Sequence, residues 1–250
     1  MKSKPFTSFA LASTLALAAV GSLNAATYFD SVDDIVYSGG VYIGLNGGTG
    51  FGAWSGSATG NGGSYMNSSG LSASTSWGIY AGGDTGNSYT VTRPFASALG
   101  IGETFTMDFG YTDVATGGEI GINLFSGGAF RLGLKFIGGG SSWQLNDGGS
   151  DFSTGIPWAG GTPGTTLKYS FTRGNDNNYS INLLHGAGIY DGNNYTASSG
   201  NMSIDSVQIY SIAQGAGENV GFNNLAIVPE PSSLSLLALS GLALLRRRRA

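Results

Sequence analysis

The stretch Thr104–Tyr111 reads TFTMDFGY, and its apolar residues recur at every second position. Successive side chains of a β-strand point to opposite faces, so this period of two predicts a strand with one buried and one polar face. The predicted buried face consists of Phe105, Met107, Phe109 and Tyr111. The opposite face consists of Thr104, Thr106, Asp108 and Gly110. The same period-two alternation of apolar residues identifies the other strands of the chain.

Four later segments repeat the alternation and form two predicted hairpins, with strands Ile120–Leu124 and Phe130–Phe136, then Leu167–Phe171 and Tyr179–Leu183. Ser126–Ala129 and Arg173–Asn178 are predicted to connect them, because Gly, Asn and Asp favour tight turns. Met202 and Ile204 are out of phase with Val207 and Ile209, which predicts a bulge near Asp205.

Two further regions complete the body of the chain. Ser38–Gly70 is dominated by Gly, Ser, Asn and Thr, which indicates loops and short edge strands. Val220 and Phe222 begin a last predicted strand, and Trp143 shares its phase with Leu145, which places it in the predicted core. No stripe of helical period occurs between Ala26 and Ala226.

About ten strands with one apolar face bury those faces most simply as two packed antiparallel sheets. We therefore expect an all-β jelly-roll sandwich over residues 26–227, flanked by an N-terminal signal helix and a short C-terminal apolar helix. A β-solenoid is the alternative, although no repeat of fixed length is present. Residues 89–227 resemble concanavalin A-like and laminin G-like modules through strand order, Trp143–Gly148 and Gly221–Leu225. The resemblance implies the same jelly roll.

Composition excludes several classes of function. The chain has no cysteine and one histidine, so disulfides, thiolate chemistry and multi-histidine metal sites are absent. Between Lys4 and Arg246, five basic residues stand against fifteen acidic ones, a net charge of −10. Such a body repels phosphate backbones and anionic headgroups, which disfavours nucleic-acid binding and favours neutral or cationic ligands.

The first 25 residues have the three parts of a secretory signal peptide. Lys2 and Lys4 precede the apolar run Phe9–Val20, and a short polar stretch follows up to Ala25. We expect signal peptidase to cleave between Ala25 and Ala26.

The last 23 residues, 228–250, have a second three-part pattern. Pro229, Glu230 and Pro231 precede an apolar run at 234–245, and the chain closes with Arg246, Arg247, Arg248 and Arg249 before its last residue. Twelve helical residues span about 18 Å, short of the roughly 30 Å hydrocarbon core, so a permanent anchor is disfavoured. The arginines resist translocation and stay cytoplasmic, so the body of the chain is expected outside.

This tail resembles the PEP-CTERM sorting signal. The resemblance implies recognition by an exosortase, a transpeptidase-like membrane enzyme, and transient insertion of the tail into the membrane. It also implies a surface or extracellular-matrix protein of a Gram-negative bacterium that makes exopolysaccharide. The motif predicts export and sorting of the protein, but it predicts no activity for residues 26–227.

The sequence gives little support to catalysis. A sandwich glycosidase needs two closely spaced carboxylates, and Glu103, Glu119 and Glu218 are widely separated along the body, although pairs formed by folding remain open. The residue types for a serine triad with His185 are present, but the chain has no nucleophile-elbow motif, and His185 is expected at a strand end facing solvent. Asp147–Asp151 and Asn175–Asn177 offer oxygen ligands for calcium, the metal most compatible with this composition, but turn geometry explains these residues equally well.

Ligand binding is expected where exposed aromatic and amide groups meet. Sugar rings stack on aromatic faces while Asp and Asn bind hydroxyls. The candidate ligand-binding residues are therefore Tyr190, Asp191, Asn193, Asn194 and Tyr195, together with Trp158.

Two functions follow from these observations. The first is a non-enzymatic surface or matrix protein, structural or adhesive, that acts through polysaccharide. The alternative is a secreted carbohydrate-active hydrolase of the same fold. Carboxylates about 5 to 10 Å apart in a cleft would favour the hydrolase, and a groove with exposed aromatic residues would favour binding.

Overall fold

The structure, a computed structural model, describes residues 28–66, 71, 75–83, 85–111, 113–157, 166–175, 177–185, 188–215 and 217–229. Almost all of its regular structure is β. One 3₁₀ turn, η1, covers Ile35–Tyr37. The strands are β1 Tyr28–Asp30, β2 Ser55–Thr59, β3 Gly62–Met66, β4 Trp77–Ala81, β5 Ser88–Pro94, β6 Glu103–Tyr111, β7 Glu119–Ser126, β8 Ala129–Ile137, β9 Ser142–Asn146, β10 Phe152–Pro157, β11 Thr166–Arg173, β12 Asn178–His185, β13 Gly188–Thr196, β14 Ser206–Ile212 and β15 Asn219–Pro229.

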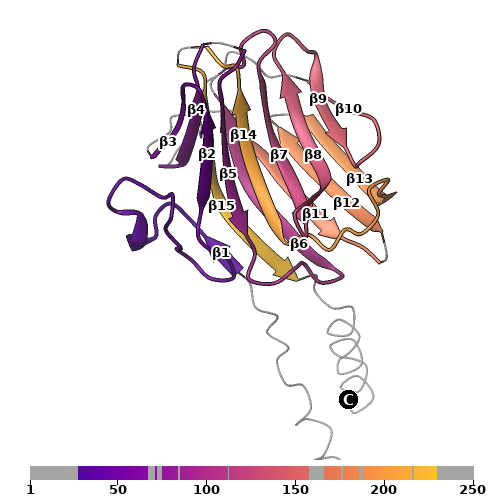
Figure 1. Cartoon of the computed structure of the whole chain (residues 1–250). Helices are drawn as coiled ribbons and strands as arrows, with labels where there is room; N and C mark the ends of the chain where they lie inside the picture. Colours follow the sequence, from indigo (N-terminus) through magenta and orange to yellow (C-terminus); the bar gives the residue numbers. More distant parts are fainter. Residues whose placement is uncertain are drawn as a thin grey trace, which may run out of the picture.

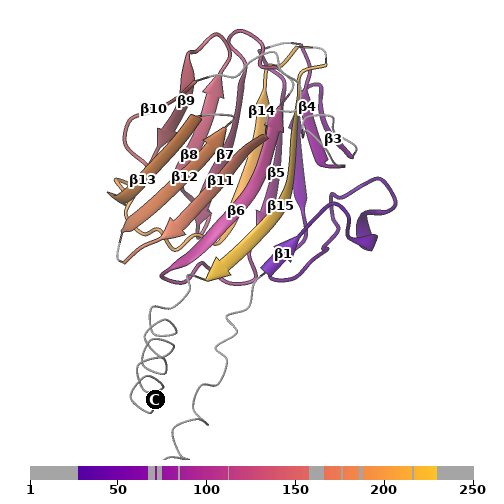
Figure 2. The same ribbon diagram turned by 180° about the vertical axis from the view of Figure 1, so that it is seen from behind.

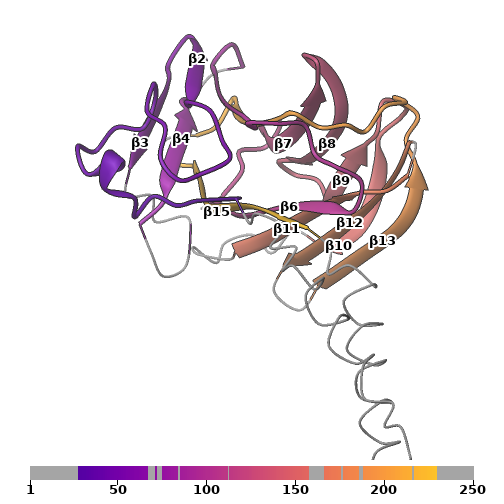
Figure 3. The same cartoon turned by 90° about the horizontal axis from the view of Figure 1, so that it is seen from below.

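The strands form two antiparallel sheets packed face to face, as the period-two patterns predict (Figures 1 and 2). The eight-stranded sheet has the order β13-β12-β11-β6-β15-β4-β3, with β1 paired to β15. The seven-stranded sheet has the order β10-β9-β8-β7-β14-β5-β2. Figure 3, a view along the strands from below, shows the sheets as two layers. The expectation of a jelly-roll sandwich is therefore confirmed.

Both predicted hairpins are present. β7 and β8 are joined by Gly127 and Gly128, whose φ angles of 58° and 77° suit the two-residue turn that matches strand twist. β11 and β12 pair from Leu167 opposite His185 to Arg173 opposite Tyr179. Within Ser38–Gly70, β2 and β3 are the edge strands of the two sheets, which confirms that expectation.

Two details of the predicted pattern are wrong. Met202 and Ile204 precede β14, which begins at Ser206, so their phase change marks a loop before the strand. Phe130 does not share the buried face of Leu132, because the β7–β8 register shifts between Leu124 and Phe125. The Phe130 side chain is 38% exposed.

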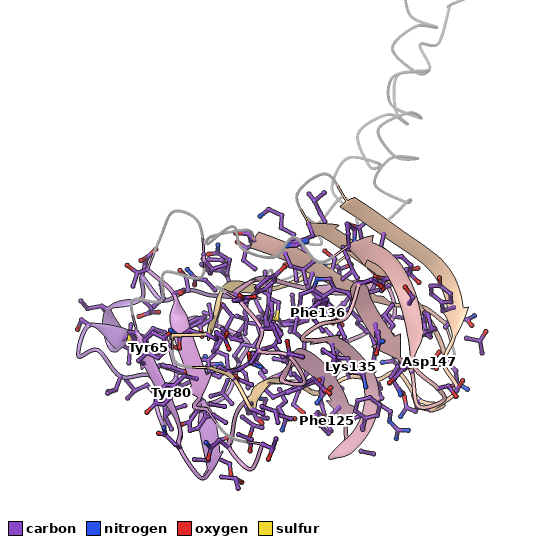
Figure 4. The ribbon with its side chains drawn as sticks, turned by 90° about the horizontal axis from the view of Figure 1, so that it is seen from above. Tyr65, Tyr80, Phe125, Lys135, Phe136 and Asp147 are labelled. Carbon is purple, nitrogen blue, oxygen red and sulfur yellow. The ribbon has the colours of Figure 1, made fainter. Side chains whose placement is uncertain are left out.

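The core lies between the sheets and is rich in aromatic residues. Trp143 is fully buried, as its phase predicts, and Figure 4 shows Phe136 toward the interior of the sandwich and Lys135 toward the outer side of the sheet. The glycine-rich N-terminal third contributes Trp54, whose ring lies 5.2 Å from that of Trp77 and 5.4 Å from that of Phe222. These contacts attach the weakly patterned part of the chain to the sandwich.

Both ends of the described chain lie at the same end of the sandwich. Tyr28 pairs with Ile227 across β1 and β15, and β15 continues to Pro229, which lies opposite Glu103 at the start of β6. The last strand thus extends two residues beyond position 227, up to the first proline of the sorting motif.

A polar groove on the seven-stranded sheet

The outer face of the seven-stranded sheet contains a groove of about 320 Å³. Its lining residues alternate along the strands with core residues such as Ile122, Leu134 and Ile209, which explains why they are polar. The lining residues that matter for chemistry are Glu119, Asn123, Phe130, Lys135, Asp151, Gln208 and Tyr210. They come from β7, β8 and β14 and from the loop before β10.

Two glycines inside strands create the hollow. A Cβ at Gly121 would lie 2.5 Å from the Tyr210 hydroxyl on the neighbouring strand, and 2.5 Å from the Leu134 carbonyl oxygen. A Cβ at Gly133 would lie 2.9 Å from the Asn123 side-chain oxygen and 3.1 Å from the Phe130 ring. Without these side chains, the Tyr210 and Phe130 rings can lie low across the sheet.

Tyr210 and Glu119 form the floor of the groove. The Tyr210 hydroxyl donates a hydrogen bond of 2.5 Å to Glu119 Oε1. Burial raises the pKa of Tyr210, and the negative charge of Glu119 raises it further. The phenol therefore stays protonated near neutral pH, and Glu119 is held as an acceptor.

An ion pair forms one wall. Lys135 Nζ lies 2.7 Å from Asp151 Oδ2, and Asn146 Nδ2 donates to Asp151 Oδ1 at 2.8 Å. The hydrogen bond from Lys135, followed by that from Asn146, lowers the pKa of Asp151. Asp151 is therefore ionised at neutral pH and cannot serve there as a general acid.

Amide and aromatic groups complete the groove. Asn123 Nδ2 donates to Gln208 Oε1 at 3.2 Å, directly across the β7–β14 ladder. Phe130 packs edge-on against Phe125, with ring centroids 6.2 Å apart. An apolar ring beside amides and carboxylates is the combination that holds a neutral sugar, through stacking and hydroxyl hydrogen bonds.

The residues predicted to bind ligand lie elsewhere. Tyr190 and Tyr195 are on β13, at the edge of the eight-stranded sheet, where both pack against the core and their hydroxyls are 2.6 Å apart. Asp191, Asn193 and Asn194 belong to the same strand, and Trp158 lies outside the described residues. The structure does not unite these residues with the groove, and their role in binding stays a prediction.

His185 differs from the expectation of a solvent-facing residue. It ends β12, as expected, but its side chain is buried and its Nε2 lies 2.8 Å from the Tyr111 hydroxyl. The inward phase of Tyr179, Ile181 and Leu183 continues to position 185, which is the physical reason for the difference.

The suggested calcium ligands are partly engaged by the protein. Asp147 accepts a hydrogen bond of 3.2 Å from Tyr179, and Asp151 is paired with Lys135. Among the residues that the structure describes, no three His, Cys, Asp or Glu side chains form a group suited to a metal ion. Calcium binding by Asn175–Asn177 stays a prediction, since position 176 is outside the described residues.

Most of the targeting residues lie outside the described part of the chain. These are Ala25 and Ala26 at the expected signal cleavage site, and Glu230, Pro231 and Arg246–Arg249 in the tail. The expected apolar helix at 234–245 is outside it as well. No helix within the described ranges is long and apolar enough to cross a bilayer.

The groove residues could not be found from the sequence by their types alone. Polar residues that alternate with core residues are the usual solvent face of a strand. Gly121 and Gly133 were the available signal, because glycine inside a strand often marks a close approach of other groups.

Comparison with known proteins supports the assignment of the tail. Residues 228–249 match the family model of the PEP-CTERM protein-sorting motif. This motif marks an exported protein that is held transiently at the membrane and processed by an exosortase. The match covers the tail only, and no curated protein matches the sequence.

Several solved structures have a low-identity likeness to the chain, among them a calreticulin globular domain, a galectin and a sialidase. The Trypanosoma cruzi calreticulin globular domain is 13% identical over 74% of this chain and 87% of that one, with a TM-score of 0.47. The Caenorhabditis elegans galectin LEC-6 is 13% identical over 55% and 89%, with a TM-score of 0.38. A sialidase is 9% identical over 62% of this chain, which spans only 15% of the sialidase, with a TM-score of 0.47. These likenesses concern the fold alone.

Proposed function

We propose that this chain is a surface or extracellular-matrix protein of a Gram-negative bacterium, with an adhesive role through polysaccharide bound in the groove. Signal peptidase and an exosortase-type enzyme process its two ends. The observation that carries the binding role is the groove itself, where Phe130 and the Asn123–Gln208 amide pair lie together. Because the body is acidic, neutral glycans are the preferred ligands.

A glycan-array screen of the exported protein tests this proposal. Gln208→Ala removes one side of the amide pair, and we expect it to weaken binding by about 3- to 10-fold, the value of one hydrogen bond. Lys168→Ala is the matched control, because Lys168 lies on the outer face of the other sheet, paired with Asp108. Equal effects of the two substitutions, or no glycan bound by the wild type, would contradict the proposal.

A hydrolase is the second candidate, because Glu119 and Asp151 line the same groove. Glycoside hydrolysis needs one protonated carboxyl to donate to the leaving oxygen. The pKa of Asp151 is lowered, so Asp151 does not supply that proton at neutral pH, and Glu119 Oε1 is already engaged by the Tyr210 hydroxyl. Release of reducing ends from a bound glycan by the wild type, lost in Glu119→Gln, would favour the hydrolase over the binding protein.

A further inference from the structure

The end of the sandwich where β15 finishes, here called the exit end, contains Tyr28, Phe29, Ile101, Glu103 and Pro229. Phe29 lies opposite Ala226, and Pro229 lies opposite Glu103, two residues after Ile101. Figure 1 shows β1, the start of β6 and the tip of β15 at the same lower end of the molecule. The tail therefore leaves the domain from the midst of these residues.

Two large apolar side chains at the exit end face outward. Phe29 is 47% exposed and Ile101 is 62% exposed. Single exposed apolar residues are common on protein surfaces and mean little alone. These two lie on either side of the strand that leads into the membrane-sorting tail, and this position gives them significance.

The length of the tail limits how far the exit end can lie from the membrane. Only Glu230–Ser233 separates β15 from the apolar run, and four extended residues reach at most about 14 Å. Twelve apolar residues in the expected helix would cover about 18 Å of a hydrocarbon core roughly 30 Å thick. While the tail is inserted, this shortfall pulls the exit end into the headgroup region.

The charges at the exit end suit a zwitterionic surface. Glu103 accepts a hydrogen bond of 2.7 Å from the Gly100 amide. Arg173 donates to the Leu99 carbonyl and, at 3.0 Å, to the Ser203 hydroxyl. Asp205, which precedes β14 at this end, accepts a hydrogen bond of 2.6 Å from the Gly127 amide. Two acids against one base, each bonded within the protein, leave no positive charge there to attract anionic lipid.

We propose that the exit end rests on the non-cytoplasmic face of a zwitterionic bilayer while the tail is inserted, with Phe29 and Ile101 in contact with lipid. The inference depends on the membrane-held tail of the proposed function. It fixes the orientation of the domain, with the strands rising from the membrane. Contacts of this kind bury apolar groups about 5 to 10 Å into the boundary between headgroups and acyl chains.

The absence of cysteine permits a direct test with the full chain in phosphatidylcholine vesicles. Ile101→Cys introduces a single labelling site for an environment-sensitive fluorophore at the exit end. Ser141→Cys is the matched control, exposed in the β8–β9 turn at the opposite end, where Ile137 pairs with Glu119 at the start of β7. We expect lipid-borne quenchers to quench the label at position 101 about threefold more than the label at position 141.

Two results would overturn the inference, and they are distinguishable. A chain that sediments with vesicles but is quenched equally at both positions overturns the lipid contact alone. A chain that does not sediment with vesicles overturns both the contact and the membrane-held tail. Strong quenching of the label in Ile101→Cys, and weaker quenching in Ile101→Cys with Phe29→Ser, would support contact of both apolar side chains with lipid.

Discussion

Arg93 and Asp30 form a fully buried ion pair, with Arg93 Nη2 2.7 Å from Asp30 Oδ2 and neither side chain exposed. Arg93 also donates to the Gly47 carbonyl at 2.9 Å and to Asn46 Oδ1 at 3.1 Å, and its guanidinium lies 5.0 Å from the Trp54 ring centroid. Arg93 is on β5, so this one side chain joins the N-terminal segment to the seven-stranded sheet. Burial is the main cause of the raised pKa of Asp30 and of the lowered pKa of Arg93.

We expect Arg93→Met to lower the free energy of unfolding by about 3 to 5 kcal/mol, because it leaves a buried carboxylate without its partner. Urea unfolding followed by circular dichroism measures the change. The double variant Asp30→Leu/Arg93→Met removes both charges and should lose less stability than the single variant. A double variant as unstable as Arg93→Met would show that packing, and not the unpaired charge, dominates.

A second prediction concerns the only histidine, His185. Burial lowers its pKa from the ordinary value of 6.5. The folded chain therefore binds this proton less readily than the unfolded chain, so its contribution to stability is complete above pH 6.5 and declines as the pH falls below that value. Because a single proton is involved, this titration cannot change the free energy of unfolding by more than about 1.4 kcal/mol per pH unit.

Unfolding free energies of the wild type and of His185→Gln between pH 5 and 8 check this expectation. The difference between the two proteins should shrink toward low pH, because Gln does not titrate. A difference that is constant over the whole range would rule out titration of His185 as a source of pH dependence.

The strands could be predicted from the sequence more readily than the groove. Apolar alternation in β6, β7, β11 and β12 depends on local side-chain direction, so it is visible in each segment alone. The groove combines Glu119 with Tyr210, which are 91 positions apart, and their meeting depends on β14 pairing with β7. Phe130 was misplaced because one bulge reversed its face. The tail was predictable because its information lies in a short, ordered motif.

The two groove glycines should respond differently to alanine. At Gly133 the nearest atoms belong to the Asn123 and Phe130 side chains, which can move, so Gly133→Ala should fill the groove and weaken glycan binding with little loss of stability. At Gly121 a backbone carbonyl lies 2.5 Å from the added carbon, so Gly121→Ala should destabilise the sheet by about 1 to 3 kcal/mol.

Thermal unfolding and glycan titration of both variants separate these effects. Gly86→Ala is the control, because its Cβ would meet no atom within 4 Å and it lies outside the groove. Unchanged glycan binding by a folded Gly133→Ala protein would place the ligand elsewhere.

The final prediction concerns the cut in the tail. Val228 and Pro229 pair with Thr104 and Glu103, so β15 is part of the sandwich up to Pro229 and cleavage is expected after this residue. If Arg246–Arg249 hold the C-terminus in the cytoplasm until the enzyme acts, replacing all four by Ser should let the tail slip through uncut although export continues. Glu230→Ala should also prevent the cut, by altering the recognised motif.

Intact-mass measurement of surface protein separates the outcomes. At 25.5 kDa for 250 residues, an uncut tail of about twenty residues adds about 2 kDa to both variants relative to the processed wild type. Ser141→Ala, in the β8–β9 turn at the opposite end of the sandwich, is the control and should be processed normally. Wild-type surface protein that still contains Arg246–Ala250 would refute the mechanism. The arginines would then remain in the mature protein, and no enzyme would have cut the chain at the exit end.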